Sequence, residues 1–314
     1  MSPTGDPARH GGESIARAQH RIARALAAGG IAEPAGEARR LVAAALGLTG
    51  AQMLSRSAEP VGAECEEQLA AFLQRRLRHE PLSRIVGTRE FYGRAFKVTP
   101  ATLDPRPETE TIIEAACALL ADARQSPLRL LDIGTGTGAI VLTLLAEFPR
   151  ATGVATDVSA AALAVALENA QALGLAERVS LVETDLAEGL EGPFDIVVSN
   201  PPYVASGDIE GLAREVKDFD PRLALDGGDD GLAVYRRLAQ ALPALAPQGT
   251  ILLEVGFNQA EAVIGILESA FVRAGTAADT RTFLDVAGIR RVVAARARSS
   301  GYAEKALGFS KPAE

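Results

Sequence analysis

The chain has few of the side chains that build metal sites and catalytic triads. Its 314 residues include three histidines, and His10, His20 and His79 all lie in the first quarter. The rest of the chain therefore lacks the base of a Ser-His-Asp triad and the ligands of a histidine-bound metal site. The two cysteines, Cys65 and Cys117, lie far apart, so we predict neither a disulfide framework nor a metal site.

Long apolar runs are missing as well. No stretch approaches membrane-spanning length, and no N-terminal segment has the charged and apolar regions of a secretion signal. We therefore expect a soluble, cytoplasmic protein that does not associate with a membrane. We also expect a monomer. The formal net charge of −8 argues against nucleic acid as the partner, although it leaves room for a local basic patch.

Apolar residues near the N-terminus recur at helical spacing. In "SIARAQHRIARALAAGG", Ile15, Ala18, Ile22 and Leu26 are three or four positions apart, and two further stretches repeat the pattern. These stretches predict a small bundle of short helices without strands. We assign residues 13–80 to this helical domain and residues 1–12, which are small and polar, to a disordered N-terminus.

The next segment changes character. Its β-formers, which begin with Ile85 and Val86, are interrupted by Gly87 and Gly93. This pattern predicts a β-hairpin connector over residues 81–107.

From Glu108 onward, apolar runs of strand length alternate with helical patterns. Strands are predicted at 128–134, 152–157, 179–185, 194–200, 250–256 and 290–296, and helices at 108–123, before 148, and at 159–173, 231–244 and 258–271. This alternation predicts an α/β domain over 108–296, with a doubly wound, mostly parallel sheet covered by helices on both faces. The remainder, 297–314, is expected to be a loose tail.

A glycine-rich loop follows the first strand of this domain. In "LLDIGTGTGAIVLTLL", Gly134, Gly136 and Gly138 separate the strand from a helix, and Asp157 ends the next strand. Glycines permit positive φ and close approach of a ligand, and Asp157 is placed to bind both hydroxyls of a ribose. The loop also fits the dinucleotide fingerprint through Ala139, so by itself it leaves nicotinamide cofactors and S-adenosyl-L-methionine (AdoMet) open.

The stretch "SNPPY" ends the fourth strand and decides between these cofactors. The Asn200 side chain and the Pro201 carbonyl offer two hydrogen-bond acceptors, and the two prolines stiffen the loop. Tyr203 supplies a flat face for stacking. Because the strand ends at the same crevice, Asn200, Pro201, Pro202 and Tyr203 are predicted to form a receptor for a planar –NH2 group.

Asn-Pro-Pro-Tyr combined with this glycine loop resembles the AdoMet-dependent amino methyltransferases, which act on nucleobase amines or on glutamine. More specifically, "REFYGRAFKVTPATLDPRPETE", "DIGTGTGAI", "SNPPYV" and "EVKDFDPRLALDGGDDGLAVYRRL" resemble the HemK/PrmC family of release factor glutamine methyltransferases. The resemblance covers about residues 13–296. The chain departs from the family at Asp104, where many members have an aliphatic residue, and in its long tail.

The resemblance implies a Rossmann-like class I methyltransferase that uses AdoMet to methylate N5 of the glutamine in the Gly-Gly-Gln motif of class 1 peptide chain release factors, a step of translation termination. Carried over to this sequence, it implies that Gly134, Thr135, Gly136, Thr137 and Gly138 line the methionine part of AdoMet, Asp157 its ribose, and Asp185 and Leu186 its adenine. Asn200, Pro201 and Tyr203 are the implied catalytic residues. The helical domain is implied to recognise the protein substrate, and the stretch 106–108 either closes over the cofactor or is an ion-paired helix start.

Other functions remain open at this stage. A nucleic-acid amino methyltransferase uses the same receptor and needs a positively charged groove. The candidate groove consists of Arg75, Arg76, Arg78, Arg84, Arg89, Arg94 and Lys97. A ribosomal-protein glutamine methyltransferase is a second alternative. A sensor that binds AdoMet without catalysis has no use for an amine slot, and no hydride-handling site for a dehydrogenase is present.

Overall fold

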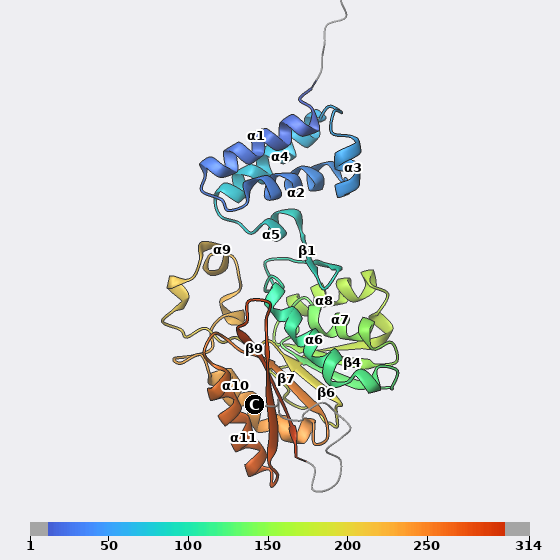
Figure 1. The fold of residues 1–314 in the computed structure, drawn as a ribbon, viewed down its shortest axis with the longest axis vertical. Helices are drawn as coiled ribbons and strands as arrows, with labels where there is room; N and C mark the ends of the chain where they lie inside the picture. Colours follow the sequence, from blue (N-terminus) through green and yellow to red (C-terminus); the bar gives the residue numbers. More distant parts are fainter. Residues whose placement is uncertain (1–11, 299–314) are drawn as a thin grey trace, which may run out of the picture. The chain divides into compact units, whose positions relative to one another are not determined.

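The computed structural model describes residues 12–298, which form two compact units, one ending at Gly87 and the other beginning at Thr88 (Figure 1). The predicted disordered N-terminus, 1–12, and loose tail, 297–314, lie almost entirely outside the described residues. Where the tail is described, it is ordered. Ala297 ends the last strand and pairs with Ala278, so the sheet extends one residue past its predicted end.

The first unit is the predicted helical bundle. Its helices are α1 (Ile15–Ala28), α2 (Pro34–Leu46), α3 (Gly50–Ser55), α4 (Ala63–Leu77) and α5 (Leu82–Val86). The apolar face of α1 is buried, with Ile22 and Leu26 at 0% exposure. A buried ion pair joins two of the helices, with Arg76 Nε 2.5 Å from Glu37 Oε2.

The connector differs from its prediction at its start. Ile85 and Val86 belong to helix α5 rather than to a strand, and Ile85 is buried in the core of the first unit. Gly87 ends this helix with a φ of 78°. The hairpin that follows is β1 (Thr88–Phe91) and β2 (Arg94–Lys97), so the β-formers around Gly93 are assigned correctly.

The second unit is built on a seven-stranded sheet with the order β5-β4-β3-β6-β7-β9-β8. The strands are β3 (Arg129–Ile133), β4 (Thr152–Asp157), β5 (Val179–Glu183), β6 (Ile196–Ser199), β7 (Thr250–Glu254), β8 (Ala278–Leu284) and β9 (Arg290–Ala297). The first five are parallel, and β9 pairs antiparallel with both β7 and β8. The predicted doubly wound, mostly parallel sheet is confirmed. The sequence missed β8, an edge strand in which Ala278 alone is buried.

Helices cover both faces of this sheet (Figure 1). On one face lie α6 (Glu110–Leu119), α7 (Ala139–Glu147) and α8 (Ala160–Ala172), and on the other α10 (Ala233–Leu245) and α11 (Ala260–Arg273). Each face of the sheet has its own hydrophobic core, and successive residues of a strand point into one core and then the other. Leu130 packs with α6 and α7, and Leu131 packs with α10 and α11. Strands covered on both faces are apolar throughout, which explains the unbroken runs in the sequence.

Short helical turns occupy the longer connections. They are η1 (Pro107–Thr109), η2 (Ala121–Ala123), η3 (Ala176–Arg178), η4 (Ile209–Gly211), α9 (Arg214–Lys217) and η5 (Arg222–Ala224). Of these, η1 directly precedes α6, whereas η4, α9 and η5 lie in the long segment between β6 and α10. Both segments reach the carboxyl edge of the sheet, where the cavity described below is found.

Asn169 on α8 joins the hairpin to the glycine loop. Its Oδ1 accepts a hydrogen bond from the Lys97 N–H at 2.7 Å, and its Nδ2 donates to the carbonyls of Lys97 at 3.1 Å and Thr137 at 2.9 Å. The side chain is 2% exposed. Three backbone groups therefore depend on this one amide for their buried hydrogen bonds.

We expect Asn169→Leu to destabilise the second unit by roughly 3 kcal/mol, because each buried polar group left without a partner costs about 1–3 kcal/mol. Urea unfolding followed by circular dichroism measures this loss. The matched control is Glu168→Gln on the same helix, where the Lys97 ion pair is about half exposed. An exposed ion pair contributes at most about 1 kcal/mol. If Glu168→Gln lowered the free energy of unfolding as much as Asn169→Leu does, the structural role of the Asn169 amide would be contradicted.

Candidate active site

A cavity of about 380 Å³ lies at the carboxyl ends of the parallel strands, a size typical of small-molecule sites. It sits where the sheet order changes direction, because β4 and β6 flank β3 on opposite sides. The predicted residues that line it are Gly134, Thr135, Gly136, Thr137, Asp157, Asp185, Leu186, Asn200 and Pro202. Gly138, Pro201 and Tyr203 were predicted in the site but do not line the cavity.

The glycine loop requires its glycines for conformation. Gly134, Gly136 and Gly138 have φ values of 75°, 56° and 79°, which other residues adopt only with strain. The N–H groups of Gly134 and Thr135 both donate to the Thr156 carbonyl, at 2.9 and 2.8 Å. An added Cβ at Gly134 or Gly136 would meet no protein atom within 4 Å. Space beside the loop is therefore left for a ligand.

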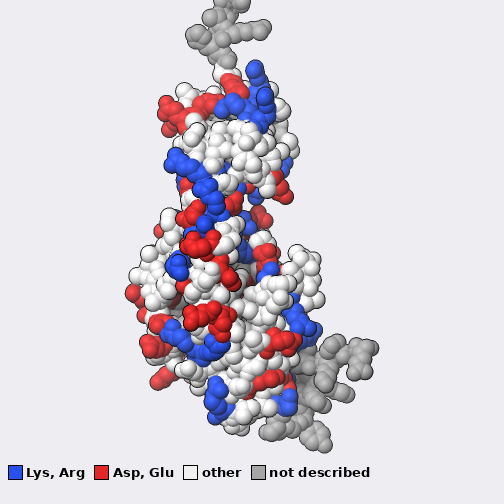
Figure 2. Space-filling view, turned by 90° about the vertical axis from the view of Figure 1, so that its left-hand side faces the viewer, with Lys and Arg blue, Asp and Glu red and all other residues white. Residues whose placement is uncertain are grey.

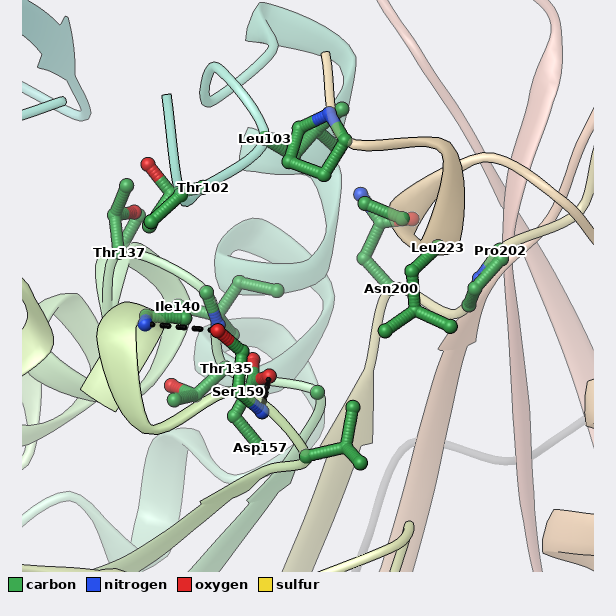
Figure 3. Close-up of a pocket in the computed structure, with 18 of the residues that line it drawn as sticks. Thr102, Leu103, Thr135, Thr137, Ile140, Asp157, Ser159, Asn200, Pro202 and Leu223 are labelled. Carbon is green, nitrogen blue, oxygen red and sulfur yellow. Dashed lines mark hydrogen bonds between the residues drawn. The ribbon is translucent and has the colours of Figure 1, made fainter. Parts of the chain in front are cut away.

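Asp157 ends β4 at the cavity wall. Its Oδ2 accepts a hydrogen bond from the Gly136 N–H and its Oδ1 from the Ser159 N–H, both at 2.9 Å (Figure 3). A carboxylate has lone pairs for about four hydrogen bonds, so two remain for a ligand. The two N–H groups fix the direction in which Asp157 presents them.

Asp185 and Leu186 follow β5 and line the same cavity. Asp185 is ion-paired at 2.7 Å with Arg237 of α10, another lining residue. Leu186 has a φ of 55°, and its carbonyl accepts a hydrogen bond from the Thr156 hydroxyl at 2.7 Å. This bond holds an apolar side chain at the wall in a strained backbone conformation, which is consistent with the predicted contact to a flat apolar group.

Asn200 faces Asp157 across the cavity, with Pro202 and Leu223 beside it (Figure 3). It follows β6, whose last residue, Ser199, is held by a 2.7 Å hydrogen bond from its hydroxyl to the Ile133 carbonyl of β3. The Asn200 Nδ2 donates to Thr109 Oγ1 at 3.2 Å. The carbonyl oxygen of the side chain therefore remains as an acceptor.

Tyr203 lies behind the cavity wall. A Cβ added to Gly256 would come within 3.0 Å of the Tyr203 ring, and Gln259 Nε2 donates to the Tyr203 carbonyl at 3.0 Å. The carboxyl group of Glu254 lies near the Tyr203 side chain and acts on it electrostatically. Burial raises the pKa of Tyr203 above its usual value, so the phenol stays protonated. The ring thus supports the loop from behind rather than forming a face of the cavity.

Comparison with known proteins identifies the family. Residues 17–87 match the PrmC N-terminal domain, and residues 109–217 match the methyltransferase small domain. A release factor glutamine methyltransferase of Bradyrhizobium diazoefficiens is 44% identical over 91% of this chain and 95% of that protein. One of Cereibacter sphaeroides is 46% identical over 86% and 94%. The chain belongs to the release factor glutamine methyltransferase family.

Solved structures share the fold. The catalytic domain of hMettl16, in complex with the MAT2A 3'UTR hairpin 6, matches with a TM-score of 0.55 at 17% identity, over 74% of this chain and 83% of that one. The predicted class I methyltransferase fold is confirmed by this likeness and by the family. As a member of the release factor glutamine methyltransferase family, the chain is a methyltransferase, and its predicted cofactor, AdoMet, is confirmed.

Two loops of this family member complete the cavity, and of their residues only the stretch 106–108 had a predicted role. The stretch 101–106 contributes Thr102, Leu103 and Arg106, and the stretch 221–226 contributes Leu223. Arg106 Nη2 lies 2.6 Å from Oδ2 of buried Asp220. Arg106 is therefore ion-paired and also lines the cavity, whereas closure of the stretch 106–108 over the cofactor stays a prediction.

Asp132 is a second residue that the sequence did not single out. It is fully buried in β3, where its Oδ2 accepts hydrogen bonds from the Thr135 hydroxyl at 2.7 Å and the Val141 N–H at 3.3 Å. Burial raises the pKa of Asp132 to about 7. The sequence does contain a signal for this residue, because a single carboxylate inside an apolar strand, as in "LLDIG", must be buried and hydrogen-bonded. Asp132 braces the glycine loop against the start of α7.

Proposed function

We propose that this protein transfers the methyl group of AdoMet to the side-chain amide nitrogen of the glutamine in the Gly-Gly-Gln motif of class 1 peptide chain release factors. The observation that carries the proposal is the position of Asn200, which lines the same cavity as the glycine loop and Asp157 and whose Nδ2 is engaged by Thr109. An acceptor there suits an amide that brings two N–H groups.

The cavity offers each part of AdoMet a suitable surface. The glycine loop leaves room for the methionine part, and Asp157 presents free lone pairs to the ribose hydroxyls. Leu186 and Asp185 suit the adenine, whose face is apolar and whose amine donates hydrogen bonds. The Asn200 carbonyl receives the glutamine amide. We keep the backbone carbonyl of Pro201, a residue that does not line the cavity, as the proposed second acceptor, with Pro202 and Tyr203 supporting the loop.

The reaction requires the protein to position a poor nucleophile. Bound AdoMet supplies an electrophilic methyl group on sulfur. The amide lone pair is delocalised, so Asn200 and Pro201 hold the nitrogen at a fixed distance of about 3–3.5 Å from its target. Their oxygens bind the N–H groups more strongly as positive charge develops on nitrogen, which favours the transition state. The nitrogen loses one proton to water after it gains the methyl group.

Surface charge supports a protein substrate over nucleic acid. Figure 2 shows basic and acidic side chains interspersed on the face drawn. Four of the seven residues of the candidate basic groove are neutralised in ion pairs: Arg75 with Glu80, Arg76 with Glu37, Arg94 with Glu147, and Lys97 with Glu168. Affinity for a nucleic acid comes largely from protein cations that neutralise its phosphates and so release its counterions. A cation that is already paired with a carboxylate contributes little to this release. The alternative of a nucleic-acid methyltransferase is therefore disfavoured.

The proposal assigns the helical unit to recognition of the release factor outside its Gly-Gly-Gln loop. Residues 17–87, which match the PrmC N-terminal domain, form a unit separate from the methyltransferase domain, which supports that role. We place the protein in the cytoplasm as a monomer. Among residues 12–298, no helix has the length and apolar character needed to span a bilayer.

Transfer of methyl-labelled AdoMet tests this function directly. The purified protein is incubated with a class 1 release factor, a ribosomal-protein mixture, total rRNA or genomic DNA, and the label in each is counted. We expect label on the release factor alone. Label on a ribosomal protein or on nucleic acid would retain the chemistry but replace the substrate, and label on none of them would overturn the proposal.

A further inference from the structure

The side-chain amide of Gln259 joins three segments of the second unit. Gln259 lies between β7 and α11. Its Nε2 donates to the Tyr203 carbonyl at 3.0 Å and to the Gly231 carbonyl at 3.4 Å, and its Oε1 accepts the Gly256 N–H at 3.0 Å. One side chain therefore links the Asn-Pro-Pro-Tyr loop to the turn after β7 and to the segment 227–231.

These contacts fix which way the Gln259 amide is turned. A glutamine side chain has one oxygen that accepts hydrogen bonds and one NH2 group that donates two. The NH2 group of Gln259 faces two carbonyl oxygens, and its oxygen faces an N–H group. The reverse orientation would set oxygen against oxygen and nitrogen against nitrogen. All three contacts thus require an amide at this position, and neither a carboxylate nor an apolar side chain can reproduce them.

Gln259 is attached to a rigid part of the second unit. Every residue of β7, the strand before it, is buried. The Gln259 carbonyl accepts the Val263 N–H at 3.0 Å, so its backbone is bonded into the start of α11. A core strand on one side and a helix on the other set the position of Gln259, and its side chain holds the loop against this frame.

Two glycines let the segment 227–231 lie directly against the same loop. A Cβ added at Gly227 would lie 2.9 Å from the Pro202 carbonyl oxygen, and one at Gly231 would lie 2.3 Å from the Tyr203 carbonyl oxygen. Any other residue would have to push these carbonyls away. The close approach is what brings the Gly231 carbonyl within reach of the same NH2 group that binds Tyr203.

Backbone hydrogen bonds continue this contact along the chain. The Val204 N–H donates to the Leu225 carbonyl at 2.9 Å, and the Val204 carbonyl accepts the Gly227 N–H at 2.8 Å. The Ser206 N–H donates to the Gly228 carbonyl at 3.0 Å. The end of the loop is therefore held on one side by this segment and on the other by Gln259.

The two prolines stiffen the middle of the loop but do not orient it. Proline fixes its own φ and restricts the residue before it to extended conformations, so Asn200 to Pro202 move nearly as one unit. A stiff unit keeps one direction in the protein only when both of its ends are held. Ser199 holds the start through its hydrogen bond to β3, and Gln259 holds the end through the Tyr203 carbonyl.

We infer that Gln259 is a positioning residue for the methyl-acceptor slot, whose amide holds the end of the Asn-Pro-Pro-Tyr loop so that the Asn200 and Pro201 oxygens keep their direction toward the substrate amide. The inference rests on the proposed function and deepens it, because it adds a residue outside the cavity on which the slot depends. Gln259 does not line the cavity, so its loss acts through the loop and leaves the AdoMet surface formed by the glycine loop and Asp157 in place.

The first test is the change Gln259→Glu, which keeps the acceptor for Gly256 but sets a carboxylate oxygen against the carbonyls of Tyr203 and Gly231. We expect kcat to fall roughly 10- to 100-fold, because two hydrogen bonds are lost, while the Kd for AdoMet, measured by calorimetry, changes less than about threefold. Gln259→Met, which has a similar length and adds no charge, should show the same split. The matched control is Gln248→Glu, at an exposed position outside the cavity.

The control should keep kcat within about twofold of the wild-type value, since surface changes are close to neutral. A kcat for Gln259→Met equal to that of the control would overturn the inference. A loss of AdoMet affinity as large as the loss of kcat would overturn it as well, because the whole domain and not the slot would then be damaged.

A double-mutant cycle with Asn200→Ala separates positioning of the slot from an independent effect on the fold. If Gln259 acts through the slot, its removal costs little once the slot has lost its main acceptor. We expect Asn200→Ala with Gln259→Met to have a kcat within about threefold of that of Asn200→Ala alone. A loss in the double variant equal to the product of the two single losses would overturn the inference.

Hydrogen exchange followed by mass spectrometry tests the hold on the loop without any substrate. We expect the amides of Val204 and Ser206 to exchange at least about tenfold faster in Gln259→Met than in wild-type protein, while those of β6 keep their rates. Unchanged exchange at Val204 and Ser206 would overturn the inference. Failure of the wild-type enzyme to label any release factor would instead count against the proposed function, and the exchange rates would still show whether Gln259 holds the loop.

Discussion

Replacing Asn200 with alanine is expected to reduce kcat for release-factor methylation by roughly 10- to 1,000-fold. The variant loses the acceptor that binds the amide most strongly in the transition state, and one such interaction is worth at least about tenfold. The structure adds that the Asn200 amide is already held by Thr109, so wild-type enzyme does not need to orient it during the reaction. Steady-state kinetics with the purified factor measure the loss.

The matched control is Gln125→Ala, which removes a side-chain amide from an exposed position outside the cavity. It should leave kcat within about twofold, since surface changes are close to neutral. AdoMet affinity, measured by calorimetry, should fall less than kcat in Asn200→Ala. Turnover by Asn200→Ala equal to that of the control would remove Asn200 from the mechanism.

The second large effect concerns the substrate. A release factor in which Gly-Gly-Gln is changed to Gly-Gly-Glu should bind poorly to the slot and should not be methylated. Glutamate sets a carboxylate against the oxygens of Asn200 and Pro201 and has no N–H group to donate. Each lost hydrogen bond costs about 1–3 kcal/mol, before charge repulsion is added.

The control for this experiment is a Gln→Glu change at a surface glutamine of the release factor outside the motif, which should be methylated at the wild-type rate. Scintillation counting of label from AdoMet gives both rates under the same conditions. Comparable turnover of the Gly-Gly-Glu factor would mean that the slot does not recognise an amide.

The parts of the site that the sequence predicted are those whose chemistry is local. The positive φ of Gly134, Gly136 and Gly138 follows from their place between a strand and a helix, and the structure has all three. Asp157 and Asn200 end parallel strands, and such ends share one edge of a sheet, so their meeting at one cavity could be predicted without coordinates.

The parts that were missed depend on contacts between distant segments. Thr109 begins a helix like many threonines, and its hydrogen bond with Asn200 joins two positions that are 91 residues apart. Arg106 and Asp220 pair across a similarly long interval. The periodicity of apolar residues shows which face of a helix or strand a residue lies on, but it does not show which distant residue contacts it. The roles of these residues depend on such contacts.

Burial explains the remaining differences. Tyr203 does not line the cavity, because its ring packs against Gly256 and its carbonyl is held by Gln259, and its stacking on the substrate stays a prediction. Ile85 and Val86 have the composition of a strand, yet Ile85 completes the core of the first unit from a helix. In both cases tertiary packing overrides a local preference.

Tandem mass spectrometry of the release factor after incubation with the enzyme and AdoMet tests the central claim most directly. The account predicts one added methyl group, on the side-chain nitrogen of the glutamine in Gly-Gly-Gln, present with wild-type enzyme and reduced with Asn200→Ala. A methyl group on any other residue, or the same yield from both enzymes, would contradict it.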